Sequence, residues 1–203
     1  MSVETAKVVA EFLKAHQIFS VNLMGGEICC NPNWREILDL LLPTVEITRI
    51  VSNGDWVQVE PEFADYVAKH DNCYVAISKD QWHTNKNIEA AQDVLIKTGV
   101  TCKVSDLNEE EFNLVPVGNA QFEMGLYSMF GTYCSNPEHQ YSFLIDEEGK
   151  IYKCAFGVWD YADVHDYREG GFAERFKEFN MKFYDIFIGS CSRCARSYQF
   201  SGK

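Results

Sequence analysis

Phe19-Ser-Val-Asn-Leu-Met-Gly-Gly-Glu-Ile-Cys-Cys-Asn-Pro-Asn33 is the stretch from which the fold of this chain can be predicted. Apolar and polar residues alternate over its first five positions, which is the period of a β-strand, so we expect a strand over 18–24. That strand ends at Gly25-Gly26, and Glu27 follows at the turn. The stretch therefore brings two glycines and a carboxylate to the C-terminal edge of a strand, where α/β folds usually keep their sites.

Helices and strands alternate outward from this stretch. Apolar residues at helical spacing predict a helix over 3–16. On the other side, Asn31-Pro32 predicts an N-cap with proline at the first helical position, opening a helix over 34–42. Further strands are predicted over 45–51, 73–78, 100–105 and 114–117, and further helices from Glu60-Pro61 onward and over 87–98.

This alternation predicts an α/β fold in which parallel strands form a sheet or part of a barrel, with the helices outside. The helix over 3–16 has no strand before it, although a βα repeat would place one there. We therefore expect a partial (β/α) barrel of parallel strands that lacks its first strand.

The pattern changes after Gly118, which predicts a domain boundary near residue 120. We expect residues 1–120 to form the partial barrel and residues 121–203 to form a small α+β domain. Within the second domain, strands over 141–146 and 150–156 form a predicted hairpin with Gly149 in its turn. A short helix over 172–179 and a strand over 183–188 are expected to follow.

Composition limits the partners and the compartment. The chain has 203 residues, 46% of them hydrophobic, and a net charge of -12 with a pI near 4.8. No run of lysine or arginine stands out, so a nucleic acid partner is not expected. No apolar run approaches the ~20 residues that a membrane span needs, and the charged, amphipathic N-terminus does not resemble a signal peptide. We therefore expect a cytoplasmic protein, in which closely spaced cysteines favour metal or redox chemistry over disulfides.

Four of the eight cysteines lie in the predicted second domain: Cys134, Cys154, Cys191 and Cys194. Cys191 and Cys194 form a C-x-x-C pair. Four thiolates suit a tetrahedral zinc site or an iron–sulfur cluster, and the sequence does not separate the two. The alternative is that some of them are buried core cysteines.

The other four cysteines carry no such prediction. Cys29 and Cys30 are adjacent, and adjacent cysteines chelate one metal poorly, so packing or an accidental pair is the simpler interpretation. Cys73 and Cys102 fall in predicted strands and are expected in the core.

Polar residues follow three successive strands of the predicted sheet. Gly25, Gly26 and Glu27 follow the first strand, Ser52 and Asn53 the second, and Ser78 the third. Each of them alone is explained as a turn residue. Together they predict a small-molecule site at one edge of a parallel sheet. His83, in the loop after the third strand, is either a proton donor or substrate contact, or a loop residue without such a role.

With these motifs in order, the chain resembles the radical S-adenosylmethionine (radical SAM) family, in its members with a C-terminal twitch or SPASM-like auxiliary cluster domain. Gly25-Gly26-Glu27 resembles the family's Gly-Gly-Glu-Pro motif, with Ile28 in place of proline, and Asn31-Pro32-Asn33 is similar to its continuation. Ser52-Asn53-Gly54 is similar to the family's Thr-Asn-Gly turn. The stretches 78–83 and 115–118 are similar to its Ser-x-Asp-x-x-His segment and to the segment that closes the barrel.

The resemblance implies a radical SAM, iron–sulfur enzyme. Such an enzyme cleaves S-adenosylmethionine to a 5'-deoxyadenosyl radical, which abstracts hydrogen from a small-molecule or peptide substrate. It also implies two sets of binding residues. Those that bind S-adenosylmethionine are Gly25, Gly26, Glu27, Ser52, Asn53 and Ser78. Those that bind the metal, as ligands of one auxiliary 4Fe-4S cluster, are Cys134, Cys154, Cys191 and Cys194.

The chain departs from the family at one defining motif. The C-x-x-x-C-x-x-C loop that binds the catalytic cluster, and the strand before it, are absent from the sequence. We therefore expect the C-terminal part of such an enzyme, with a second polypeptide as one source of the missing strand and loop. A truncated chain and a degenerate binding protein remain open. The alternative function is a non-catalytic four-cysteine module that holds zinc or a cluster and binds a peptide or partner protein.

Overall fold

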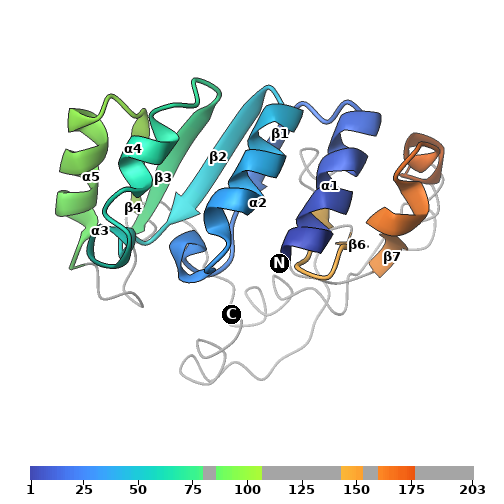
Figure 1. Cartoon of the computed structure of the whole chain (residues 1–203), viewed down its shortest axis with the longest axis horizontal. Helices are drawn as coiled ribbons and strands as arrows, with labels where there is room; N and C mark the ends of the chain where they lie inside the picture. Colours follow the sequence, from blue (N-terminus) through green and yellow to red (C-terminus); the bar gives the residue numbers. More distant parts are fainter. Residues whose placement is uncertain (80–85, 107–142, 153–159, 177–203) are drawn as a thin grey trace, which may run out of the picture. The chain divides into compact units, whose positions relative to one another are not determined.

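A four-stranded parallel sheet is the centre of the first part of the chain (Figure 1). The computed structural model describes residues 1–79, 86–106, 143–152 and 160–176. Its parallel strands are β1 (Ser20–Leu23), β2 (Ile47–Ser52), β3 (Cys73–Lys79) and β4 (Cys102–Asp106), and they lie in the order β1-β2-β3-β4. The predicted mixed α/β fold with a parallel sheet is therefore confirmed.

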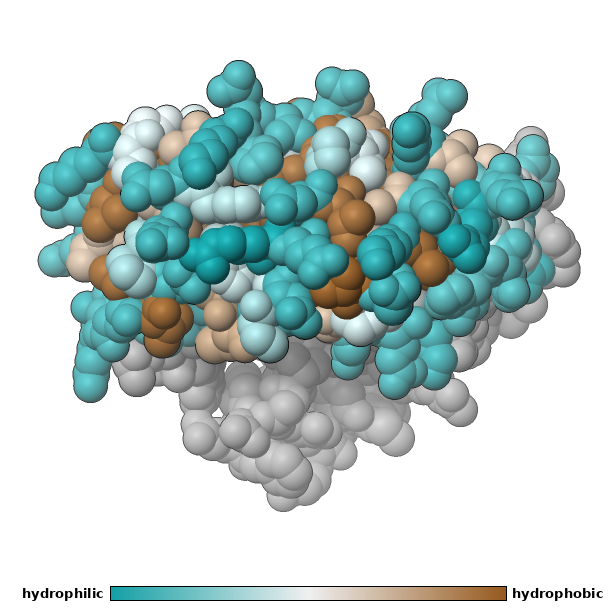
Figure 2. Space-filling view, viewed as in Figure 1, coloured by the Kyte–Doolittle hydropathy of each residue, from teal (hydrophilic) through white to brown (hydrophobic). Residues whose placement is uncertain are grey.

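The helices of this part lie side by side, all of them over one face of the sheet except α1, which lies past its β1 edge (Figure 1). They are α1 (Val3–Ala15), α2 (Trp34–Leu41), α3 (Trp56–Val59), α4 (Phe63–Val67) and α5 (Ile88–Lys97). Two 3₁₀ turns accompany α2, η1 (Ile28–Cys30) before it and η2 (Leu42–Thr44) after it. Figure 2 shows that this helix-covered side is mainly hydrophilic at its surface.

Strand alternation explains the core between the helices and the sheet. Ile50, Val75 and Ile77 point toward the helices and are fully buried, and Trp56 and Phe63 cover them from α3 and α4. The ring centroid of Phe63 lies 5.6 Å from that of Trp34 and 5.2 Å from that of Trp56. These aromatic side chains account for much of the apolar area that stabilises this core.

Helix α1 begins at a Ser2 N-cap, whose Oγ accepts a hydrogen bond from the Thr5 N–H at 3.0 Å. Six of its residues are buried: Ala6, Val8, Val9, Ala10, Phe12 and Leu13. None of them belongs to the core cluster between the sheet and the other described helices, and α1 packs chiefly on α2 and η2. Helix α1 therefore lies beyond α2, toward the β1 end of the sheet (Figure 1).

One predicted helix cap was wrong, and one short helix was not predicted. The N-cap of α2 is Asn33, not Asn31. Asn31 Oδ1 accepts a hydrogen bond from the Asn33 N–H at 3.0 Å, and this local turn holds Pro32 outside the helix. The helix predicted from Glu60-Pro61 is present as α4, although it begins only at Phe63. Helix α3, which ends before a Glu60 C-cap, was not predicted.

The chain divides into two compact units, residues 2–112 and residues 113–203 together with Met1. The described part of the second unit is an antiparallel sheet of β5 (Leu144–Ile145), β6 (Lys150–Tyr152) and β7 (Asp160–Asp163), followed by η4 (Val164–Tyr167). The predicted hairpin is confirmed, since β5 pairs with β6 and Gly149 has a φ of +93°.

Hydrogen bonds to the Asp146 carboxylate stabilise the turn of this hairpin. Asp146 Oδ1 accepts the N–H groups of Glu148 and Lys150, and Asp146 Oδ2 accepts the Tyr152 hydroxyl at 2.8 Å. Residues 172–176 are helical, which agrees with the described part of the helix predicted over 172–179. The strands predicted over 114–117 and 183–188 lie outside the described residues. Across the described ranges, no helix has the length and apolar character of a membrane span.

Candidate functional site

Glu27 is the centre of the polar cluster at the C-terminal edge of the sheet. It follows Gly25, which has a φ of +132°, a value that favours glycine. Glu27 Oε2 accepts hydrogen bonds from the Ser52 hydroxyl at 2.7 Å and from the Asn53 N–H at 3.2 Å. The other carboxylate oxygen, Oε1, is buried and has no hydrogen-bond partner among the described residues.

Burial sets the protonation of this carboxylate. Removal from water raises the pKa of Glu27 above its ordinary value, and nearby Asp55 raises it further. Hydrogen bonds from Ser52 and from the N–H groups of Asn53 and Ile28 lower that pKa but do not cancel the effect of burial. No described cation pairs with Glu27. The cluster therefore has an acceptor oxygen that a positively charged ligand would satisfy.

Ser52 and Gly54 hold the turn against which Glu27 rests. Ser52 is buried, and its Oγ also accepts the Gly54 N–H at 2.9 Å. Gly54 has a φ of +87°, and a Cβ at this position would lie 3.3 Å from the Ala91 Cβ. Helix α5 thus packs closely on the turn and limits how far Ser52 can move.

The side chain of Asn53 is used within the turn. Asn53 Nδ2 donates to Asp55 Oδ2 at 2.9 Å, and Asn53 Oδ1 accepts the Asp55 N–H at 2.9 Å. Asn87 Nδ2 donates to the other oxygen of Asp55, and Asn87 Oδ1 accepts from Gln58. Asn53 therefore supports Glu27 through its backbone N–H. Asp55 and Asn87 were not among the predicted site residues, although Asp55 directly follows the Ser52-Asn53-Gly54 stretch.

Gly25 and Gly26 leave the backbone beside Glu27 open. A Cβ built on either glycine would meet no described atom within 4 Å. Space at the glycines, next to a buried acceptor oxygen, is what close approach of a ligand to the backbone requires.

Ser78 lies on the adjoining strand but on the other face of the sheet. It pairs in register with Ser105, whereas Ser52 pairs with Ile77, which points into the core. The structure thus joins Glu27, Ser52 and Asn53 by hydrogen bonds, with Gly25 and Gly26 beside them. It places Ser78 at the same end of the sheet, on the face opposite the helices.

The predicted metal ligands Cys134, Cys154, Cys191 and Cys194 lie outside the described residues, as does His83. In the described part of the chain, no three His, Cys, Asp or Glu side chains come together as a metal site would require.

Three of the four described cysteines pack in or against the core, as predicted, and Cys30 does not. Cys73 is buried in the core, and Cys102 packs against it. Burial raises the pKa of both Cys29 and Cys73 to about 12, so these thiols stay protonated at neutral pH. Cys30, next to Cys29, is exposed.

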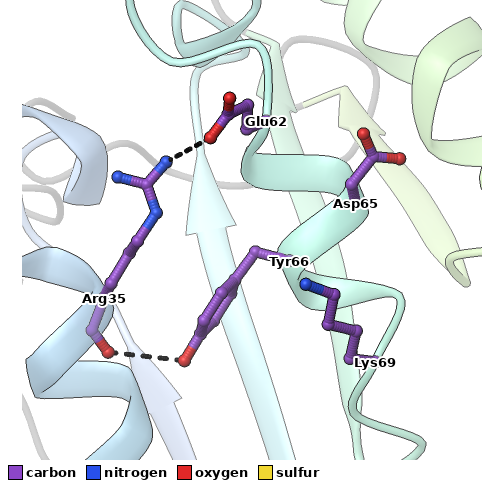
Figure 3. A pocket seen from close by; sticks show the side chains of 5 residues that line it. All are labelled: Arg35, Glu62, Asp65, Tyr66 and Lys69. Carbon is purple, nitrogen blue, oxygen red and sulfur yellow. Dashed lines mark hydrogen bonds and ion pairs between the residues drawn. The ribbon is translucent and has the colours of Figure 1, made fainter.

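A second polar cluster lies on the helix side, where a groove of about 340 Å³ is lined by Arg35, Glu62, Asp65, Tyr66 and Lys69 (Figure 3). Arg35 Nη2 pairs with Glu60 at 2.7 Å and with Glu62 at 2.9 Å. The Tyr66 hydroxyl donates to Asp39 at 2.5 Å. Arg35, which lines this groove, is already paired with Glu60 and Glu62. The groove is therefore explained as a contact between α2 and α4.

Comparison with known proteins does not assign the chain to a family. No protein-family model matches the chain, and a search of curated proteins finds no match.

Proposed function

We propose that this chain binds S-adenosylmethionine at the Glu27 edge of its parallel sheet, as part of a radical SAM enzyme with one auxiliary 4Fe-4S cluster. One observation carries the proposal: Glu27 is held by Ser52 and Asn53 through one oxygen, and its other oxygen is buried without a partner among the described residues. A buried carboxylate oxygen is stabilised best by a charged donor, and an ammonium group is such a donor.

The donor set at this edge fits the amino-acid end of S-adenosylmethionine. Glu27 would accept the ammonium group, and the open backbone at Gly25 and Gly26 would admit the ligand. Ser52 and Asn53 would keep the carboxylate in place, and Ser78, at the end of β3, would face the remainder of the ligand. When bound at a reduced cluster, this cofactor supplies the radical that abstracts hydrogen from a small-molecule or peptide substrate.

The finer architecture belongs to the same proposal. Residues 1–120 would form a partial (β/α) barrel, and residues 121–203 a twitch-like domain that ligates the auxiliary cluster through Cys134, Cys154, Cys191 and Cys194. A second polypeptide, or a further stretch of the same polypeptide, would supply the first strand and the C-x-x-x-C-x-x-C loop. The position of α1 supports this arrangement, because α1 packs beyond α2 where a helix following such a strand would lie.

Calorimetric titration of S-adenosylmethionine into the full chain, reconstituted anaerobically with iron and sulfide, tests the cofactor site. We expect Glu27→Gln to weaken binding by about tenfold or more, because a charge-assisted hydrogen bond is lost. Glu89→Gln is the matched control, since Glu89 is exposed in the first turn of α5 and should leave binding unchanged.

A ligand variant identifies the atom involved. An S-adenosylmethionine analogue without the amino group should bind the wild-type chain about as weakly as S-adenosylmethionine binds Glu27→Gln. It should lose little more on the Glu27→Gln variant itself, because both changes remove the same contact. Absence of binding to the wild-type chain, or equal affinity of wild type and Glu27→Gln, would overturn the proposal.

A further inference from the structure

A row of hydrogen bonds joins the start of helix α5 to Glu27. Asn87, at the N-cap of α5, donates from its Nδ2 to Asp55 Oδ1 at 2.9 Å. The other carboxylate oxygen, Asp55 Oδ2, accepts from Asn53 Nδ2 at 2.9 Å. The backbone N–H of Asn53 in turn donates to Glu27 Oε2 at 3.2 Å. We call these four residues, Asn87, Asp55, Asn53 and Glu27, the Asn87 relay.

The relay crosses the ends of three successive strands. Glu27 follows β1, Asn53 and Asp55 follow β2, and Asn87 follows β3 and directly precedes α5. The backbone of Asn87 also lies close to the turn, because a Cβ on Gly54 would be 3.4 Å from the Asn87 carbonyl oxygen. Asn87 therefore meets the turn that carries Asn53 with both its side chain and its backbone.

The side chain of Asn87 does not cap its own helix. Asparagine at an N-cap usually accepts an N–H group from the first turn of the helix. Asn87 makes no such bond. Its Oδ1 instead accepts from Gln58 Nε2 at 2.8 Å, while its Nδ2 donates to Asp55. Helix capping thus does not explain the orientation of this amide, whereas the contact with Asp55 does.

Asp55 depends on neutral donors. It is half-buried, and no described cation pairs with it. Without Asn87, Asp55 Oδ1 would lose the amide that donates to it, and hydration would favour movement of the carboxylate toward water. Asn53 would move with it, because Asn53 Nδ2 donates to Asp55 and Asn53 Oδ1 accepts the Asp55 N–H. The N–H group of Asn53 would then no longer hold Glu27.

We infer that Asn87 is a positioning residue for Glu27, acting through Asp55 and Asn53 to keep the Glu27 carboxylate where it accepts the ammonium group of a ligand. This inference rests on the proposed function in taking that ligand to be S-adenosylmethionine. The hold on Glu27 in the ligand-free chain is tested separately.

Serine and aspartate at position 87 separate positioning from helix capping. Asparagine, aspartate and serine are about equally good N-caps, so a capping role predicts the same affinity for S-adenosylmethionine in all three chains. The relay predicts graded losses in calorimetric titration of the reconstituted full chain. Asn87→Ser, too short to reach Asp55, should bind about threefold or more weakly than wild type. Asn87→Asp should lose about tenfold or more, because it sets two carboxylates against each other.

Asn33→Ser is the matched control. Asn33 is the N-cap of α2 and likewise makes no cap hydrogen bond with its side chain, so this variant should change affinity by less than about twofold. Equal affinity of wild type, Asn87→Ser and Asn87→Asp would overturn the inference.

A double variant shows whether Asn87 acts through Glu27. Glu27→Gln/Asn87→Ser should bind S-adenosylmethionine within about twofold of Glu27→Gln alone, because the contact that Asn87 supports is already lost. Losses that multiply in the double variant would overturn the inference, since they would mean that Asn87 acts independently of Glu27.

Amide hydrogen exchange of the ligand-free chain tests the relay without the cofactor. The Asn53 N–H should exchange at least about threefold faster in Asn87→Ser than in wild type, and at the wild-type rate in Asn33→Ser. Unchanged exchange in Asn87→Ser would overturn the inference even where S-adenosylmethionine binds at Glu27. Faster exchange in a chain that binds no S-adenosylmethionine would uphold the relay and reject the proposed cofactor site.

Discussion

At the scale of single residues, Glu27 is a described carboxyl group whose pKa is raised by burial. Burial favours its neutral form, while Ser52 and Asn53 donate hydrogen bonds to its charged form. The net effect is a raised pKa, so the folded state holds this proton more tightly than the unfolded state. Stability contributed by the protonated carboxyl is therefore fully present below the ordinary pKa of 4.5 and is lost as pH rises through the folded value.

The pH dependence of unfolding gives a prediction for this residue. The free energy of unfolding of wild type relative to Glu27→Gln should fall as pH rises from about 4 toward neutrality, because glutamine carries no charge at any pH. Urea denaturation of both proteins at several pH values, without ligand, measures this difference. A difference that does not change with pH, or that grows as pH rises, would contradict the burial of a charged Glu27.

The residues of the site could be named from the sequence, but their contacts could not. Strand ends and turn residues predict which positions meet at one edge of a parallel sheet, and Glu27, Ser52 and Asn53 do meet there. The face on which each side chain lies depends on register, which the sequence does not specify closely. For this reason Ser78 was grouped with Ser52, although the two lie on opposite faces.

At the scale of elements, hydrophobic patterns and cap signals located the four strands of the described parallel sheet and the helices α1, α2, α4 and α5. The miss is at a short element. Helix α3 has four residues, too few to show a helical period. Its position is set by the packing of Trp56 in the core beside Phe63, which no local signal reports.

This packing leads to a prediction for Phe63. Its ring is fully buried and contacts both Trp34 and Trp56, so Phe63→Ala should lower the free energy of unfolding by about 3–5 kcal/mol. Val59→Ala, in the neighbouring helix at a side chain that is 59% exposed, should change it by no more than about 0.5 kcal/mol. Urea denaturation followed by circular dichroism measures both. Similar losses for the two variants would show that α4 does not anchor the core.

At the scale of the whole molecule, the cysteines of the second unit decide between the two functions that the sequence left open. After anaerobic reconstitution, an auxiliary 4Fe-4S cluster predicts about four irons per chain and a brown absorbance, with both lost in Cys191→Ala. Cys29→Ala should keep the iron, because burial holds the Cys29 thiol protonated in the first unit. A colourless chain with one zinc ion would support the four-cysteine module instead.

The strand order has a consequence for how the sheet forms. Each parallel strand pairs with the next one in the sequence: Ser20 with Ile47, Thr48 with Cys73, and Val75 with Cys102. Every pairing therefore closes a loop of about 26 residues, and no later strand has to insert between earlier ones. Because each loop between paired strands is short and of similar length, the contact order is low for a parallel sheet. The described part of the sheet can thus be extended from β1 to β4 strand by strand as the polypeptide leaves the ribosome.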